Sequence, residues 1–144
     1  VGADGEPVTS RRREVQVDAV CLSGGLMPLA ELPAVLGCGF ARDERLGGDV
    51  PLHGPDMEST VPGLFVAGDV TGVEGAEVAM AKGRLAGLAV CRRLGREVRD
   101  AEIEAARRKL DRARQEAKIE FYPGARQAAG AMGQRWREVA WVDP

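Results

Sequence analysis

A glycine-rich stretch in the middle of the chain contains the residues best suited to bind a ligand. The apolar run at residues 64–67 ends at Gly68 and Asp69, and a second glycine turn follows before a predicted helix. Glycine lets a ligand approach the backbone, and a helix start offers unpaired N–H groups and a positive dipole end to an electron-rich atom. A carboxylate at this junction could accept hydrogen bonds from sugar-like hydroxyls, whereas it would repel phosphate. Asp69 capping a turn is the structural alternative.

Two helices and a strand are expected to position this stretch. Residues 64–67 predict a short, fully apolar strand, and the helix after it begins near Gly75 to Glu77 and ends around Leu94 and Gly95. Residues 97–121 predict a second helix. Its apolar side chains recur at spacings of three and four, which predicts one narrow buried stripe: Ile103, Ala106, Leu110, Ala113 and Ala117.

The first part of the chain predicts smaller elements. Residues 14–22 favour a strand that stops at a glycine turn, Gly24 and Gly25, and that pairs in a hairpin with residues 2–9. A short helix is expected within residues 29–37, and residues 37–63 predict short strands and turns. Cys21 is expected to be a small core residue on the strand.

Composition excludes several functional classes. The chain has 144 residues, 44% of them hydrophobic and 29% charged, with a formal net charge of -2. This balance indicates a globular protein and argues against nucleic-acid binding driven by net charge. We expect no membrane span, because no apolar run approaches the ~18 residues required. The cytoplasm is the expected location.

The remaining titratable residues give no catalytic assignment. His53, the single histidine, is expected to anchor a loop or lie at the surface, and Asp56, Glu58 and Glu74 are expected to be solvated. The three cysteines, Cys21, Cys38 and Cys91, have no metal-ligand spacing, so we expect neither a zinc site nor a disulfide framework. The catalytic residues are therefore unknown from the sequence, and no metal is expected.

The segment TVPGLFVAGDVTG, residues 60–72, resembles the second FAD-binding motif of flavoproteins with two dinucleotide-binding domains. This class includes the pyridine nucleotide-disulfide oxidoreductases. Upstream, residues 17–28 resemble the strand that leaves an inserted NAD(P)-type domain, but end in Ser-Gly-Gly where Ala-Thr-Gly is common. That ending, with the helix after Gly75, is more similar to the flavin subunits of bacterial amine and amino-acid oxidases: sarcosine oxidase alpha chains, opine and D-amino-acid dehydrogenases, and hydrogen cyanide synthase.

The resemblance implies an α/β fold and a bound flavin. The expected fold is a partial FAD-binding Rossmann-like domain with the end of an inserted NAD(P)-type domain and a helical carboxyl-terminal region. The corresponding boundaries are residues 1–28, 29–96 and 97–144. In the family, the motif aspartate bonds a ribityl hydroxyl of FAD and the next helix start faces the flavin pyrimidine edge. The cofactor-binding residues implied here are Gly68, Asp69, Gly75, Ala76, Glu77, Gly24 and Gly25.

The chain lacks the GxGxxG turn that holds the FAD pyrophosphate in such enzymes. The resemblance therefore implies that an amino-terminal FAD/NAD(P) region, or a companion subunit, completes the site, and that this segment alone is inactive. The expected protein is an FAD-dependent oxidoreductase that acts on an amine or amino-acid-like substrate. Two alternatives stay open: an NAD(P)H-dependent flavin reductase, which would also use NAD(P), and an assembly module that binds no flavin.

Overall fold

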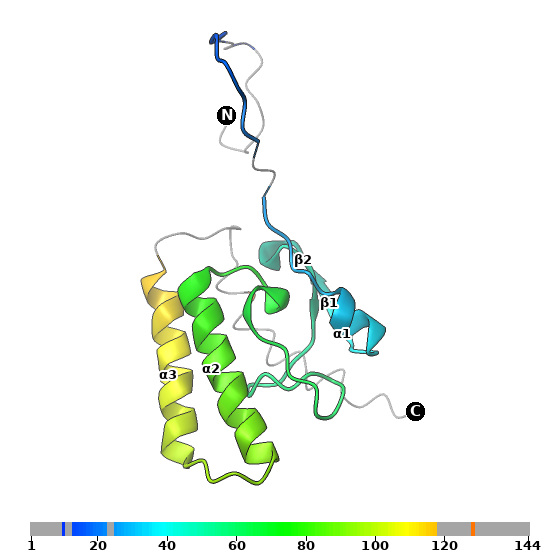
Figure 1. Ribbon diagram of the computed structural model, residues 1–144, viewed down its shortest axis with the longest axis vertical. Helices are drawn as coiled ribbons and strands as arrows, with labels where there is room; N and C mark the ends of the chain where they lie inside the picture. Colours follow the sequence, from blue (N-terminus) through cyan, green and yellow to red (C-terminus); the bar gives the residue numbers. More distant parts are fainter. Residues whose placement is uncertain (1–9, 11–12, 23–24, 118–127, 129–144) are drawn as a thin grey trace.

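The computed structural model describes residues 10, 13–22, 25–117 and 128. The described elements are, in chain order, the helix α1 (Glu31–Val35), the strand β1 (Phe40–Asp43), the 3-10 helix η1 (Glu44–Leu46), the strand β2 (Gly48–Pro51), the 3-10 helix η2 (Gly68–Thr71), and the helices α2 (Ala76–Arg93) and α3 (Asp100–Glu116). In Figure 1, α2 and α3 lie side by side on one flank, and the β1–β2 hairpin and α1 form the other.

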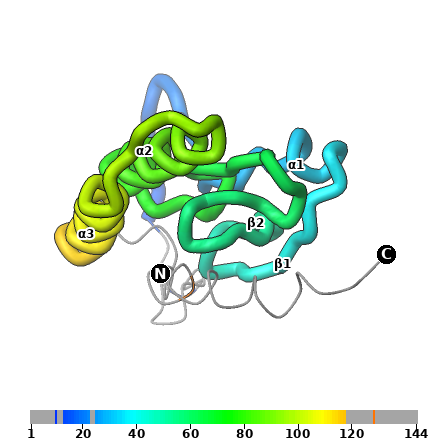
Figure 2. The backbone as a smooth tube through the Cα atoms, turned by 90° about the horizontal axis from the view of Figure 1, so that it is seen from below, coloured from blue at the N-terminus to red at the C-terminus, as the bar shows by residue number. Residues whose placement is uncertain are grey.

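The helices α2 and α3 pack against each other through the predicted apolar stripe. Ile103, Ala106 and Leu110 are buried against Val78 and Leu85 of α2. The 3.6-residue period places these side chains on one face of α3, so the prediction of an inward stripe is confirmed. Because only a short connection joins the two helices, they run antiparallel (Figure 1), and Figure 2 shows the two helices from below.

The helix ends follow the sequence signals closely. Helix α2 begins directly after Gly75, and Gly95 adopts a φ of 70° just beyond its last residue. Helix α3 begins at Asp100, three residues after the predicted start, because the Arg99 N–H donates to the Glu102 carboxylate at 3.1 Å and caps the first turn. Val98 packs on the core before the helix begins. The helix ends at Glu116, so the predicted end at residue 121 is wrong, and Ala117 of the predicted stripe lies just beyond the helix.

The sheet consists of two short antiparallel strands. Phe40 pairs with Pro51 and Asp43 pairs with Gly48, with η1 closing the hairpin. Leu46, Val50 and Leu52 form a second small core with Ala128. The prediction of short strands and turns in residues 37–63, and of a short helix before them, is confirmed. The resulting mixture of helices and a small sheet is compatible with part of an α/β fold.

The predicted strand at residues 14–22 is wrong for this structure. These residues form no strand, and Val20 and Leu22 are 74% and 89% exposed. An extended segment needs a partner strand for its backbone groups, and no described residues pair with it. In Figure 1 the segment extends away from the helices and hairpin. Cys21 is consequently exposed, and its expected core position is also wrong. Residues 2–9 lie outside the described residues.

The predicted strand at residues 64–67 is reduced to an isolated bridge between Glu58 and Phe65. Val66 N–H donates to the Met57 carbonyl at 2.9 Å, and Ser59 N–H donates to the Leu64 carbonyl at 2.8 Å. The pairing is short because the chain turns back directly at Gly63, whose φ is 86°. Val66 is buried, and Phe65 and Ala67 are half-buried. The segment therefore packs on the core, and Gly68 follows it at the edge of the core.

None of the helices among the described residues has both the length and the apolar character needed to cross a bilayer.

Candidate functional site

The candidate site consists of the loop from Gly68 to Gly75 and the first turn of α2. We call the loop, residues 68–75, the glycine loop. Three of its glycines have positive φ: 83° at Gly68, 112° at Gly72 and 99° at Gly75. Side chains are strained in this region of backbone space, so glycine is required for the chain to turn here. The sequence-based prediction of glycine turns on both sides of Asp69 agrees with this geometry.

Asp69 lies on η2 with its side chain exposed. Its backbone carbonyl accepts a hydrogen bond from Gly72 N–H at 3.0 Å. Among the described residues, none donates a hydrogen bond or forms an ion pair with the Asp69 carboxylate, and η2 has no side-chain cap. The carboxylate is thus available to accept hydrogen bonds from a ligand hydroxyl.

The start of α2 lies at the end of the same loop. Gly75 is the N-terminal cap, and the first intrahelical bond runs from Ala79 N–H to the Gly75 carbonyl at 2.9 Å. The N–H groups of Ala76, Glu77 and Val78 therefore have no partner within the helix, and the positive end of the helix dipole lies there. Ala76 and Glu77 are exposed. The loop thus offers an acceptor, Asp69, and a set of donors.

Glu77, in the first turn of α2, also borders a second hollow of the surface. Its side chain lines a separate groove of about 310 Å³ between α2 and α3, together with Met80, Arg84 and Lys109. Ala79 lies on the side of α2 that faces the glycine loop. Its Cβ is 3.9 Å from the position that a Cβ on Gly68 would take.

Three buried charged side chains support the glycine loop, and we call them the buried triad: Glu74, Lys82 and Arg114. Lys82 Nζ lies 2.7 Å from Glu74 Oε1, and Arg114 binds Glu74 through Nε at 2.7 Å and Nη2 at 3.0 Å. Their side chains are 1% exposed for Lys82, 5% for Glu74 and 17% for Arg114. The expectation that Glu74 is solvated is wrong, because its two cationic partners come from positions 8 and 40 residues away.

The surroundings within the triad change the pKa values of Glu74 and Lys82. Burial is the largest influence on Glu74 and raises its pKa, but the hydrogen bonds and charges of Arg114 and Lys82 outweigh it and leave the pKa below its ordinary value. Burial lowers the pKa of Lys82, against the opposing effect of the Glu74 carboxylate. Sequence reasoning missed this cluster. The available signal was a lysine between Ala81 and Leu85 on the buried face of α2.

Lys82 also binds the loop backbone directly. Its ammonium donates to the Gly72 carbonyl at 3.1 Å and to the Gly68 carbonyl at 3.4 Å. These carbonyls lie on either side of Asp69 in the sequence. One buried side chain on α2 thereby holds both ends of the turn that presents Asp69.

His53 lies buried near the triad. Its Nδ1–H donates to the Gly54 carbonyl at 2.9 Å, which agrees with the predicted loop-anchoring role. Burial lowers the pKa of His53, and the charges of Lys82 and Arg114 lower it further, while the Gly54 bond and Glu74 act in the opposite direction. Asp56 and Glu58 form ion pairs with Arg107 and Arg93.

The lowered pKa of His53 predicts that acid destabilises the protein below about pH 6.5. The unfolded chain binds a proton there that the folded chain does not, so the free energy of unfolding decreases as the pH falls, by at most about 1.4 kcal/mol per pH unit for one proton. We expect His53→Gln to remove this slope below about pH 6.5, as measured by denaturant titration. An unchanged slope in the variant would show that His53 does not cause it.

Gly25 is separate from the glycine loop. It has a φ of 98° and lies exposed in the segment before α1. The strand that it was predicted to end is not formed, and the assignment of Gly25 to the cofactor stays a prediction. Gly24 lies outside the described residues.

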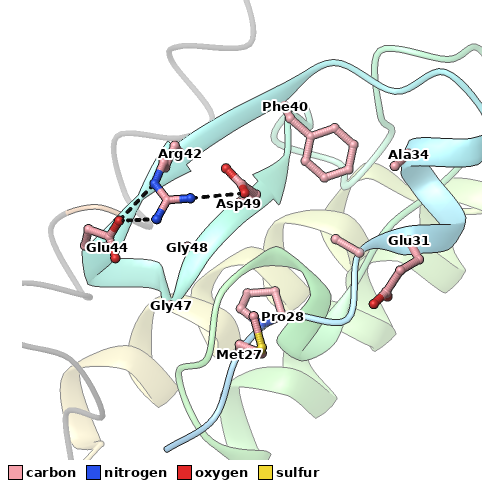
Figure 3. Close-up of a pocket in the computed structure, with 11 residues that line it drawn as sticks. Met27, Pro28, Glu31, Ala34, Phe40, Arg42, Glu44, Gly47, Gly48 and Asp49 are labelled. Atoms are coloured by element: carbon pink, nitrogen blue, oxygen red, sulfur yellow. Dashed lines mark hydrogen bonds and ion pairs between the residues drawn. The ribbon is translucent and has the colours of Figure 1, made fainter.

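A cavity of about 600 Å³ lies between residues 27–31 and the β1–β2 hairpin. Figure 3 shows Phe40 and Met27 at its wall, with Arg42 bridging Glu44 and Asp49. None of the predicted site residues lines it. Within the described ranges, no three His, Cys, Asp or Glu side chains are grouped to hold a metal ion.

Comparison with known proteins connects the glycine loop to flavoproteins. Residues 50–97, which include the loop and α2, match the model of the family described as glucose inhibited division protein A. The match confirms the resemblance to FAD/NAD(P) oxidoreductases and supports FAD as the cofactor.

The curated relatives agree with the more specific resemblance to flavin subunits of bacterial oxidases. The chain is 38% identical over 110 residues to an opine oxidase subunit of Rhizobium meliloti, covering 74% of this chain and 24% of the relative. It is 34% identical over 77 residues to the Agrobacterium tumefaciens protein of the same name, covering 54% and 15%. It is 30% identical over 139 residues to hydrogen cyanide synthase subunit HcnB of Pseudomonas aeruginosa, covering 95% and 29%. The chain thus spans less than a third of these relatives, and no solved structure matches it.

Proposed function

We propose that this chain is the FAD-contacting segment of a flavin-dependent oxidoreductase that acts on an amine or amino-acid-like substrate. The observation that carries the proposal is that two features lie together at the glycine loop. One is the first turn of α2, whose N–H groups have no partner within the helix, and the other is the exposed Asp69 carboxylate, which has no partner among the described residues. The match of residues 50–97 to the glucose inhibited division protein A family, and the similarity to opine oxidase and hydrogen cyanide synthase subunits, support the choice of flavin.

The residues present fit the middle and one edge of the cofactor. The Asp69 carboxylate would accept a hydrogen bond from a ribityl hydroxyl, and the N–H groups of Ala76 and Glu77 would face the pyrimidine edge of the ring. When bound, the flavin supplies the acceptor for the substrate's electrons. The donors and the dipole at the start of α2 would stabilise negative charge at that edge, which favours the reduced cofactor.

The rest of the site is proposed to come from outside the described residues. The pyrophosphate needs a glycine-rich turn that this chain lacks, so an amino-terminal FAD/NAD(P) region or a companion subunit would supply it. The relatives' names describe subunits, which supports a multi-subunit enzyme. In this proposal residues 1–28 end an NAD(P)-type domain, residues 29–96 belong to the FAD-binding domain, and residues 97–144 form a helical extension.

The proposal predicts that Asp69→Ala in the full-length protein weakens FAD binding. Loss of a hydrogen bond donated to a charged acceptor costs about 1 to 3 kcal/mol, which corresponds to roughly a 5- to 150-fold increase in the Kd for FAD. Asp69→Asn, which keeps an oxygen acceptor, should lose less. Reconstitution of the apoprotein, followed by quenching of flavin fluorescence, measures all three affinities.

A matched control is Asp111→Ala, because Asp111 is another exposed aspartate and lies on α3. The control should bind FAD like the wild type. An unchanged Kd in Asp69→Ala would refute the assignment of Asp69. Absence of flavin binding by the full-length wild type would instead favour the assembly module, and reduction of bound flavin by NAD(P)H would favour the flavin reductase.

A further inference from the structure

The charged side chains of the buried triad hold the glycine loop in a more specific position than apolar side chains would. Replacing a buried ion pair by apolar side chains of similar size is often neutral or stabilising, because desolvation of the charges is costly. Here the charges are arranged so that one ammonium satisfies three acceptors of the glycine loop: the carbonyls of Gly68 and Gly72 and the carboxylate of Glu74. An apolar side chain at position 82 would fill the volume but would leave these acceptors without their donor.

The acceptors of Lys82 lie on both sides of Asp69 and directly before the start of α2. Gly68 precedes Asp69, and Gly72 follows it and donates its N–H to the Asp69 carbonyl at 3.0 Å. Glu74 directly precedes Gly75, the N-terminal cap of α2. A shift of Lys82 would therefore move the Asp69 carboxylate and the first turn of α2 together.

Arg114 extends this arrangement to the second helix. It holds both oxygens of Glu74 through two hydrogen bonds, a planar geometry that fixes the carboxylate's orientation as well as its position. The Glu74 oxygen bound by Lys82 is also bound by Arg114 Nη2. Helix α3 is therefore bonded to the glycine loop through one buried carboxylate, that of Glu74.

We propose that Lys82 is a positioning residue for the flavin, and that Arg114 supports it through Glu74, so that helix α3 forms part of the cofactor site. This inference rests on the proposed function. It assigns a role to α3 that exceeds burial of its apolar stripe. The triad has one more positive than negative charge, so it also places a net positive charge directly beneath the loop.

Two consequences distinguish positioning from a structural role. First, loss of Lys82 should weaken FAD binding more than an equally destabilising change elsewhere in the same helix pair. Second, removal of the net positive charge should shift the flavin reduction potential to more negative values. The negative charge that the flavin gains on reduction would then no longer be stabilised by a nearby cation. A change in stability alone does not move the potential.

The test compares Lys82→Met with Leu110→Ala in the full-length protein. Leu110 is a buried residue of the stripe on α3 and packs in the same cluster as Val78, so its truncation destabilises the helix pair but leaves the hydrogen bonds and ion pairs of the buried triad in place. We expect Lys82→Met to raise the Kd for FAD by about tenfold or more and to make the potential more negative, whereas Leu110→Ala stays within about twofold of the wild type. An equal change in both variants, or no change in either, would overturn the inference.

Arg114→Met serves if Lys82→Met does not fold, because Arg114 is the least buried member of the triad. It should give an intermediate loss of FAD affinity and the same direction of potential shift, and Arg114→Lys should restore the potential. Wild-type affinity and potential in Arg114→Met would contradict the role of α3.

If Asp69→Ala weakens FAD binding while the triad variants do not, the inference fails and the proposed function survives. If Asp69→Ala is also silent, both fail.

Discussion

Replacing Glu74 with glutamine is expected to lower the free energy of unfolding by about 3 to 5 kcal/mol, the usual cost of removing one partner from a buried ionic cluster. The reason is the position of Glu74 between two cations. Its carboxylate accepts from Lys82 and from both ends of the Arg114 fork, and its side chain is 5% exposed. Glutamine has nearly the same shape, so the loss reports the missing charge and not a cavity. Denaturant titration of the full-length protein measures it.

Glu104→Gln is the matched control for this prediction. Glu104 also binds an arginine of α3, Arg107, but its side chain is 52% exposed. Exposed ion pairs contribute about 1 kcal/mol or less, so the control should change the free energy of unfolding only slightly. Similar small losses in both variants would show that the Glu74 cluster is solvated and does not support the glycine loop.

Gly72→Ala is expected to have the second large effect, a loss of roughly 2 to 5 kcal/mol. Gly72 has a φ of 112°, which strains any side chain, and an added Cβ would lie 2.9 Å from Cδ2 of Leu46. Leu46 is fully buried in the second core, so it has little room to move. Gly72 also carries the carbonyl that Lys82 holds and the N–H that binds Asp69, so FAD affinity should fall as well.

Gly87→Ala separates this effect from the general consequence of replacing glycine. Gly87 lies within α2, has helical backbone, and would bring an added Cβ within 4 Å of no neighbour among the described residues. Alanine there should stabilise the protein by about 0.5 to 1 kcal/mol and leave FAD binding unchanged. If Gly72→Ala behaves like Gly87→Ala in thermal and denaturant unfolding, the described conformation of the glycine loop is incorrect.

Local signals predict the helices well. Gly75 and Gly95 mark the two ends of α2, and the three- and four-residue spacing of Ile103, Ala106 and Leu110 identifies the buried face of α3. Such features depend on neighbours within one or two turns, which a sequence displays directly. The glycine loop is predictable for the same reason, because its glycines and Asp69 are contiguous.

Long-range partners are not visible in the sequence. Nothing local indicates that Arg114 reaches Glu74 across 40 positions, so the sequence alone suggests a solvated Glu74. The opposite error occurs at residues 14–22, where apolar side chains suggest a buried strand but no described strand pairs with them. A strand depends on a partner that can lie anywhere in the protein, whereas a helix satisfies its own backbone.

The proposed role of the glycine loop is that Asp69 and the first turn of α2 hold the ribityl chain and pyrimidine edge of FAD. An experimental structure of the full-length protein with FAD bound would test this role without relying on variants. We expect an Asp69 carboxylate oxygen to lie about 2.6 to 3.2 Å from a ribityl hydroxyl, with the N–H groups of Ala76 and Glu77 facing the flavin ring. A flavin bound elsewhere, with the Asp69 side chain surrounded by solvent, would contradict it.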